Sequence, residues 1–492
     1  MPEITHARPL FRILLVAAAV PFVYVAGAFL GFSYRHHAAN ASPLGMRLSP
    51  APFPRQGTRL LVFAPHCDDE TLGCGGLMQR TLTLGGSVRV VILTNGDAFR
   101  VAVQRQVRSL RVVPKDYVNF ATMRQQESLR ALEHLGVPRS SVLFFGYPDR
   151  GLTPMWNSHW SPASPFLSSY TRADRSPYAD TFDPTASYCG EDAVTDIESE
   201  MRQFKPTLVC VTHPAEDHPD HTAAAAMVTT ALLELRSEPA QAGWARRAQL
   251  AYYLVHRGDW PAPQGLHLAD PLTPPAEMLH VDTHWMSLAL TPAERSAKLQ
   301  SIRMYHSQMV MMARFLLSFA RSTELFGVID PETLPAFPYR PATGDQPAVD
   351  WNSVKPLLLD PLRDTLLRDL QGGGDIKAAY LCRDSRYLYA RLEMRLPVSS
   401  RISYTMRIRA FGSDGRSSMR TLDIRFRSRA GTERHKSGDA LDTKGNILEA
   451  AIPWSRIRGK LSGSNAKMLA VGAETYIGNL EIDHTGVRFV IL

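Results

Sequence analysis

The sequence is poor in cysteine and in runs of charge of one sign. Its cysteines are odd in number and form no CxxC pair: Cys67, Cys74, Cys189, Cys210 and Cys382. This argues against a disulfide framework and against a structural zinc site built on cysteine. No Lys/Arg-rich run occurs, although 55 basic residues face 47 acidic ones and the net charge is +8. We therefore expect no nucleic acid partner.

Long apolar runs are also scarce, with one exception near the N-terminus. Residues 13–34 carry no charge, and as a helix they would span roughly 33 Å, enough to cross a bilayer. We predict a tail over 1–12, a single-pass transmembrane anchor over 13–34 and a proline-rich linker over 35–57. A cleaved signal ending near residues 39–41 is the alternative. The flanking arginines favour a cytoplasmic N-terminus, which would place the rest of the chain outside the cytoplasm.

Residues 58–335 alternate short apolar runs with helical patterns. The expected strands are 59–65, 87–97, 142–146, 207–213 and 251–256, and the expected helices are 71–85, 121–136, 191–204, 221–235 and a long helical region over 292–326. This alternation predicts an α/β domain with a Rossmann-like, mostly parallel sheet and helices on both faces. A second linker is expected over 336–355. Short alternating runs over 356–492 then predict an all-β sandwich.

Two polar clusters lie at expected strand-to-helix turns. The first, residues 64–70, reads APHCDDE, and the second, residues 213–221, reads HPAEDHPDH. The carboxyl ends of parallel strands gather at one edge of the sheet, so the clusters can meet there. Imidazole and carboxylate groups suit Zn²⁺, and a catalytic zinc keeps three protein ligands and one open position. Capping or surface ion pairs are the alternative for either cluster taken alone.

The first cluster resembles the PHPDDE motif, and residues 218–221 resemble the HPDH motif, of the PIG-L/LmbE-like family of zinc-dependent N-deacetylases. Further matching text lies at residues 94–97, 124–127, 135–137, 146–149 and 305–308, with Glu324 and Phe326. The resemblance covers about residues 58–330. It implies a Rossmann-like fold and removal of an acyl group, usually acetyl, from an amine on a sugar.

By motif position, the resemblance implies one Zn²⁺ per chain, or another divalent metal, held by His66, Asp69 and His221. Asp68 would be the general base, and His218 would stabilise the oxyanion or act as an acid. Asp220 would orient a histidine. Cys67 stands where the family usually has proline. A thiolate there could compete for the metal, but we expect the side chain to point away.

Several other residues remain open. His213, Glu216 and Asp217 either line the cleft mouth or are solvated, and His256 either contacts substrate or is structural. Trp156, Trp160 and Tyr170 in a long loop either stack on sugar rings or pack locally. The glycines at 73, 75 and 76 do not form a nucleotide-binding GxGxxG pattern.

The C-terminal part resembles family 9 carbohydrate-binding modules at residues 374–376, 386–389 and 449–454. Arginines along its strands would suit an anionic glycan or lipid headgroup if they share a face, or else form a solvated surface: Arg401, Arg407, Arg409, Arg416, Arg420, Arg425, Arg427 and Arg429.

The sequence thus predicts a membrane-anchored zinc N-deacetylase acting on N-acetylglucosamine units of a glycan or glycolipid. Two alternatives stay open. One is a zinc amidase for a different amide, such as a thiol conjugate or an acylated lipid. The other is a non-catalytic surface protein that binds glycans.

Overall fold

The computed structural model describes residues 46–339, 349–361, 372–412, 415–426, 433–434, 440–458 and 467–492. The predicted tail and anchor, residues 1–12 and 13–34, lie outside the described residues. Among the residues that are described, no helix has the length and apolar character needed to cross a bilayer.

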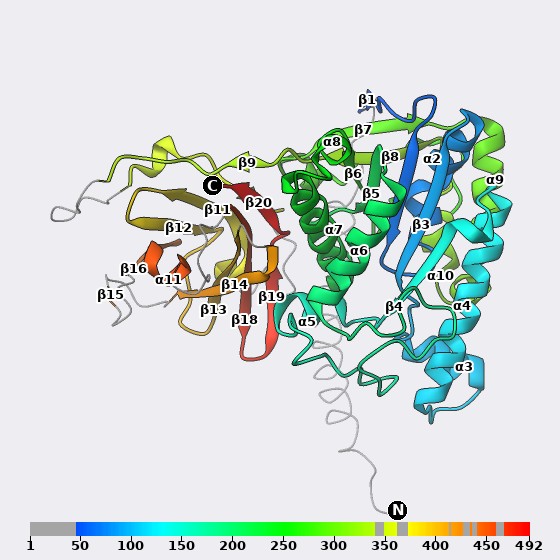
Figure 1. The fold of residues 1–492 in the computed structure, drawn as a ribbon, viewed down its shortest axis with the longest axis horizontal. Helices are drawn as coiled ribbons and strands as arrows, with labels where there is room; N and C mark the ends of the chain where they lie inside the picture. The colour runs from blue at the N-terminus through cyan, green and yellow to red at the C-terminus, as the bar shows by residue number, and fades with distance from the viewer. Residues whose placement is uncertain are drawn as a thin grey trace, which may run out of the picture.

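An eight-stranded sheet forms the centre of the first domain, in the order β1-β7-β8-β6-β5-β2-β3-β4 (Figure 1). The strands are β1 (Ser49–Pro50), β2 (Arg59–Ala64), β3 (Ser87–Thr94), β4 (Val142–Tyr147), β5 (Leu208–Thr212), β6 (Gln249–Tyr253), β7 (His284–Ala289) and β8 (Thr323–Val328). All neighbours pair in parallel except β8, which runs antiparallel to both β6 and β7. The predicted mostly parallel sheet is confirmed.

Helices cover both faces of this sheet. They are α2 (Asp69–Thr83), α3 (Arg100–Val107), α4 (Pro114–His134), α5 (Leu152–Asn157), α6 (Gly190–Phe204), α7 (Pro219–Ser237), α8 (Ala242–Ala245), α9 (Pro292–Ile302) and α10 (His306–Leu317). Alternation along β2 explains the two faces, since successive side chains of a strand point to opposite sides. Leu60 and Val62 join the core beneath α2, whereas Leu61 and Phe63 join the core beneath α6 and α7.

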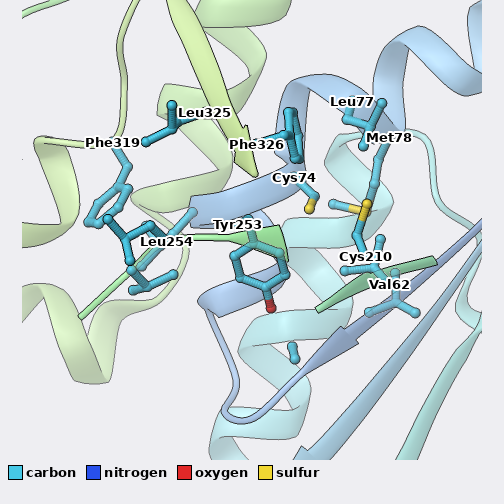
Figure 2. Close-up of a cluster of buried hydrophobic side chains, with 14 of the residues drawn as sticks. Val62, Cys74, Leu77, Met78, Cys210, Tyr253, Leu254, Phe319, Leu325 and Phe326 are labelled. Carbon is cyan, nitrogen blue, oxygen red and sulfur yellow. The ribbon is translucent and has the colours of Figure 1, made fainter. Parts of the chain in front are cut away.

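The core beneath α2 depends on a close approach between this helix and β6. Figure 2 shows Tyr253 lying beside α2, with Cys74, Met78, Cys210 and Val62 gathered next to it. A Cβ at Gly73 would clash with the Tyr253 ring. The glycines of this segment therefore serve helix packing, which agrees with the absence of a nucleotide-binding loop.

Three expectations about boundaries were wrong. The region predicted as helical over 292–326 contains α9 and α10 but ends in strand β8. The linker predicted over 35–57 is too long, because β1 pairs with β7 and the buried Phe53 packs edge-on against Phe326. The linker predicted over 336–355 starts too late, because β9 (Glu332–Thr333) already pairs with a strand of the second domain.

The second domain is a β-sandwich, as predicted. One sheet has the order β10-β11-β12-β17-β16-β15, and the other has the order β14-β13-β18-β20-β9 with β19 beside β18. Their bounds are β10 (Leu358–Leu359), β11 (Ile376–Arg383), β12 (Tyr387–Met394), β13 (Ser403–Gly412), β14 (Gly415–Phe426), β15 (Glu433–Arg434), β16 (Ala440–Lys444), β17 (Ile447–Pro453), β18 (Met468–Ile477), β19 (Leu480–His484) and β20 (Arg488–Ile491), with the short helix α11 (Trp454–Arg458). A shared apolar core fills the space between the sheets.

The β13-β18-β20 sheet buries its second face as well. Met406 and Ile408 point into the sandwich core. Phe411 and Phe489 belong instead to the apolar cluster that contains Ala223 of α7. Figure 1 shows this sheet lying against the side of the first domain formed by α5 and α7. The sandwich is therefore packed firmly against the α/β domain.

Candidate metal centre

The two polar turns meet at the carboxyl edge of the sheet. The first turn, residues 65–70, follows β2, and the second turn, residues 213–221, follows β5. These strands pair directly and in parallel, so their ends lie side by side. The structure therefore confirms the prediction that the two turns lie close together.

Three ligand-type atoms face one point between the turns. His66 Nδ1 lies 3.1 Å from His221 Nε2 and 3.3 Å from Asp69 Oδ2, and the last two atoms are 3.2 Å apart. Zinc bonds to nitrogen and oxygen of about 2.0–2.2 Å can reach all three atoms from one point. The atoms predicted to hold the metal thus form a nearly equilateral, buried triangle.

The chemistry of this triangle calls for a cation. His221 Nδ1 lies 2.6 Å from Glu216 Oε2, so a proton between them leaves Nε2 as a lone pair facing the triangle. Among the residues that the structure describes, the buried Asp69 Oδ1 has no hydrogen-bond partner. His66 has its pKa raised well above the usual value because burial, which lowers it, is outweighed by Asp149, Asp220 and Asp69. The residues fit a divalent cation, which would supply this positive charge.

Asp68 lies beside the triangle in a strained backbone conformation. Its φ is 138°, in a region that favours glycine. Its Oδ1 is 3.6 Å from Arg124 Nη2. Burial raises the pKa of Asp68 to about 8, with Asp69 and Glu70 adding to the rise and Arg124 opposing it. A bound cation would favour the carboxylate form that a general base needs.

His218 presents its ring to the same place from the start of α7. Its Nδ1 accepts a hydrogen bond from the Asp220 backbone N–H at 3.3 Å, which assigns the ring proton to Nε2. Burial and the neighbouring His66, His221 and His256 hold the pKa of His218 well below its usual range. A neutral imidazole of this kind donates a hydrogen bond to a developing oxyanion, which favours that role over acid catalysis.

Asp220 does not orient His218 through its carboxylate. Its oxygens accept from the backbone N–H groups of Arg150 at 2.5 Å and Leu152 at 3.1 Å, and one lies 3.6 Å from His66 Nε2. The carboxylate therefore holds the loop after β4, and its expected role in orienting a histidine stays a prediction. Asp149 lies equally near, with Oδ1 3.5 Å from His66 Nε2.

A cavity of about 170 Å³ opens onto this centre. Polar groups line its floor, including Asp68, Asp149 and His218, and its walls carry apolar side chains: Leu72, Ala98, Phe99, Met312 and Phe315. A pocket of this composition suits a small polar group attached to a larger molecule, with apolar walls that exclude water.

Cys67 points away from the ligand triangle, as expected. It is fully buried in the core beneath α2. Burial raises the pKa of its thiol to about 12, so it stays protonated. Its carbonyl oxygen accepts a hydrogen bond from Arg124 Nη2 at 2.7 Å. The residue therefore helps to place Arg124 and does not compete for the metal.

Of the open candidates on the second turn, none lines the cavity. His213 is buried and stacks on Trp285, with ring centroids 5.1 Å apart. Asp217 pairs with Arg257 at 2.7 Å. Glu216 is fully buried beneath His221. The cleft-mouth interpretation of these residues was wrong. The solvated alternative holds for the exposed Asp217 but not for His213 and Glu216, which are buried because the turn folds inward around the ligand histidine.

His256 does line the cavity, where its ring stacks on Phe315 at 5.1 Å. Trp156, Trp160 and Tyr170 instead pack locally, against one another or against Tyr117. Sequence reasoning missed Glu216, Asp149 and Arg124 as parts of the centre. The signal for the last two was their place in the matched text at residues 124–127 and 146–149.

Residues further along the matched text support the first turn from behind. Tyr305 donates a hydrogen bond to Glu70 Oε1 at 2.6 Å, and Glu70 Oε2 accepts from the Asp68 N–H. Glu324 accepts from Gly76 and pairs with the buried Lys298 at 2.6 Å. These contacts fix the start of α2, and with it Asp69.

Of the sandwich arginines whose side chains the structure describes, Arg407 and Arg409 are paired or buried and so do not contribute to a free cationic face. Arg407 pairs with Asp423 at 2.9 Å and with Glu474 at 2.7 Å. Arg409 is only 3% exposed and lies over the Trp156 ring at the domain interface. Arg401 and Arg425 are exposed. The side chains of Arg416, Arg420, Arg427 and Arg429 lie outside the described residues.

The fold and the centre together define a class: an α/β domain with a candidate mononuclear metal site of hydrolase type at the carboxyl edge of its sheet. Residues 61–232 match the profile of the PIG-L family, described as GlcNAc-PI de-N-acetylase. The match spans both turns and confirms the resemblance that their motifs carry. Residues 61–232 of the α/β domain are thus similar to the deacetylases of the PIG-L family.

A curated relative is the 1D-myo-inositol 2-acetamido-2-deoxy-alpha-D-glucopyranoside deacetylase of Tsukamurella paurometabola. It is 28% identical over 184 residues, which make up 35% of this chain and 54% of the relative. The chain therefore spans about half the length of this relative.

Two solved structures are similar to the chain. A deacetylase of teicoplanin biosynthesis, solved as a complex, shares 20% identity over 55% of this chain and 96% of its own, with a TM-score of 0.35. The N,N'-diacetylchitobiose deacetylase from Pyrococcus horikoshii shares 16% identity over 54% and 82%, with a TM-score of 0.33.

Proposed function

We propose that this protein is a zinc-dependent N-deacetylase that removes acetyl from N-acetylglucosamine units of a glycan or glycolipid. The observation that carries the proposal is the ligand triangle of His66, Asp69 and His221, which adjoins a cavity lined by His66 and Asp68. The PIG-L match over both turns supports the same chemistry. The curated relative, a deacetylase of a 2-acetamido sugar, supports the substrate class.

When bound, zinc would polarise the acetamide carbonyl and acidify a water molecule. The chain supplies the remaining steps. Asp68 takes the proton of the attacking water on its carboxylate and later returns it to the leaving amine. His218 donates from Nε2 to the amide oxygen as negative charge develops there. Arg124 steadies the Asp68 carboxylate, and Phe99 and Phe315 help to keep bulk water out.

We further propose that residues 13–34 anchor the chain in a membrane, with the catalytic domain outside the cytoplasm. The uncharged run of 22 residues supports the anchor. The resemblance of the second domain to carbohydrate-binding modules stays a prediction about sugar binding.

The test uses the full chain in detergent, zinc-loaded or treated with a chelator. It is offered chitooligosaccharides and an N-acetylglucosaminyl lipid, and free acetate and free amine are measured. We expect both products in equal amounts from the zinc-loaded protein and neither after chelation. Zinc-dependent release of a different acid from a thiol conjugate or acylated lipid would support the amidase alternative instead. Release of no acid, with no zinc bound, would support the glycan-binding alternative.

A further inference from the structure

A basic segment, residues 98–115, begins at the wall of the cavity, which Ala98 and Phe99 line. Residues 98–115 hold no Asp or Glu, and their basic residues are spaced along the segment rather than contiguous: Arg100, Arg105, Arg108, Arg111 and Lys115. All five are exposed. No ion pair joins any of them to a carboxylate among the described residues. The segment therefore presents unneutralised positive charge to its surroundings.

Exposed apolar side chains are interleaved with these cations. Val101 is 56% exposed, Val107 37%, Leu110 84% and Val113 55%. Leaving four aliphatic groups in water over 13 residues costs free energy that burial against a partner would recover. The opposite side of α3 is buried, with Ala102 and Val103 packed against Tyr117 and Phe120 of α4. The side of α3 that carries Val101 is therefore turned outward.

This face continues to the mouth of the cavity. Phe99, directly before α3, lines the cavity wall. Helix α10 packs beside α3, because Met311 joins the cluster of Ala102 and Val103, while its neighbour Met312 lines the cavity. Val310, on the same helix, is 54% exposed. Figure 1 shows α3 at one end of the α/β domain, on the side away from the sandwich. We call residues 100–113 with Lys115 and Val310 the α3 patch.

We propose that the α3 patch docks on the surface of a bilayer containing anionic lipids and so presents a lipid-linked substrate to the cavity. Arginines that alternate with aliphatic residues match the boundary between anionic headgroups and acyl chains. A soluble anionic glycan would engage the charges but would leave Leu110 and its neighbours in water. The proposal that the α3 patch docks on a bilayer is based on the exposure and charge of its residues. The substrate's delivery rests on the proposed deacetylase function.

The direct test is hydrogen exchange of the full chain reconstituted in nanodiscs of phosphatidylcholine alone or with 30% phosphatidylglycerol. Since residues 13–34 would hold the chain on either disc, the comparison is between lipid compositions. We expect exchange over residues 100–113 to slow at least about tenfold on the anionic discs, as three or more basic contacts to the surface predict. Equal exchange on both discs would overturn the proposal.

A charge-matched pair of variants separates the patch from general basicity. Arg105→Gln/Arg111→Gln/Lys115→Gln should remove the lipid-dependent protection, and Leu110→Ser should weaken it. Arg247→Gln/Arg401→Gln/Arg425→Gln removes the same charge from exposed positions on other surfaces and should keep the protection. Equal loss in both triple variants would contradict a specific patch. Protection by soluble dextran sulfate that survives Leu110→Ser would identify a polyanion as the partner and overturn the bilayer proposal.

An activity ratio tests substrate delivery separately. Acetate release is measured from an N-acetylglucosaminyl lipid in vesicles with 30% phosphatidylglycerol and from chitotriose in solution. The triple patch variant Arg105→Gln/Arg111→Gln/Lys115→Gln should lower the vesicle-to-solution ratio of acetate release about tenfold. The control variant Arg247→Gln/Arg401→Gln/Arg425→Gln should leave this ratio unchanged. If neither substrate releases acetate, the deacetylase proposal fails while the nanodisc result still decides the docking. An unchanged ratio in the patch variant would overturn the delivery.

Discussion

The two turns that supply the ligand triangle are held in different ways. The first turn is strained at Asp68 and is fastened within the α/β domain by Arg124 and Tyr305. The second turn has no positive φ over residues 213–221. It is fastened from two sides, by its own buried Glu216 and by the sandwich.

The sandwich touches the second turn at its backbone. His484 Nε2 lies 3.4 Å from the Glu216 carbonyl oxygen. A Cβ at Gly486 would lie 2.5 Å from the carbonyl oxygen of Pro214. The second domain therefore supports half of the metal centre. An appended β-domain can therefore support a turn that carries a ligand without lining the cavity itself.

The first turn should show the largest effect on chemistry. Asp68→Asn keeps the size of the side chain and removes the base, so acetate release should fall about 10²- to 10⁴-fold while zinc content stays near one per chain. Measurement of kcat together with metal content by mass spectrometry checks this. Loss of zinc along with activity would assign Asp68 to metal binding and contradict its role as base.

The second turn should show its effect on metal affinity. Glu216→Gln weakens the hold on His221 Nδ1, so zinc should bind about 10- to 100-fold more weakly, with much of the activity restored by excess metal. Titration against a competing chelator measures the change. Asp217→Asn, on the same turn but paired with Arg257, is the matched control and should bind zinc normally.

A substitution in the sandwich should have a smaller effect on zinc binding in the α/β domain. Gly486→Ala pushes on Pro214, and overpacking of about 1 kcal/mol would weaken zinc binding about fivefold. Gly472→Ala is the control, because a Cβ there meets no atom closer than 3.7 Å. An equal change in both variants, or none in Gly486→Ala, would show that the sandwich does not support the centre.

The smallest effect is expected at the interface cation. Among the described residues, the buried Nε of Arg409 has no hydrogen-bond partner, whereas its Nη2 donates to Asn157 Oδ1 at 2.9 Å. Arg409→Met loses that hydrogen bond but recovers a desolvation cost, so the free energy of unfolding should change by less than about 1 kcal/mol. Arg407→Met should destabilise more, because it leaves Glu474 and Asp423 without their cation. Denaturant unfolding of both variants checks the order.

The sequence predicted the parallel sheet and the sandwich because their apolar periods are strong. The two dense motifs after buried strands indicated a metal site at one edge of the sheet, and the resemblance then assigned His66, Asp69 and His221 as its ligands. The sequence did not show which atoms of these residues face one another, since this depends on how the turns after the neighbouring strands β2 and β5 fold.

Other features could not be predicted from the sequence, for physical reasons. Glu216 was expected either at the cleft mouth or in solvent, and neither interpretation anticipated its burial beneath His221. Arg409 looked like a surface charge because alternation along a strand does not reveal what covers each face. The α3 patch was missed because its cations are spaced rather than contiguous.

The most direct test of the central claim is anomalous diffraction at the zinc edge from crystals of the zinc-loaded full chain. The account predicts one peak per chain, at about 2.0–2.2 Å from His66 Nδ1, Asp69 Oδ2 and His221 Nε2. A peak held instead by His66, Asp149 and Asp220, or no peak at this edge of the sheet, would contradict it.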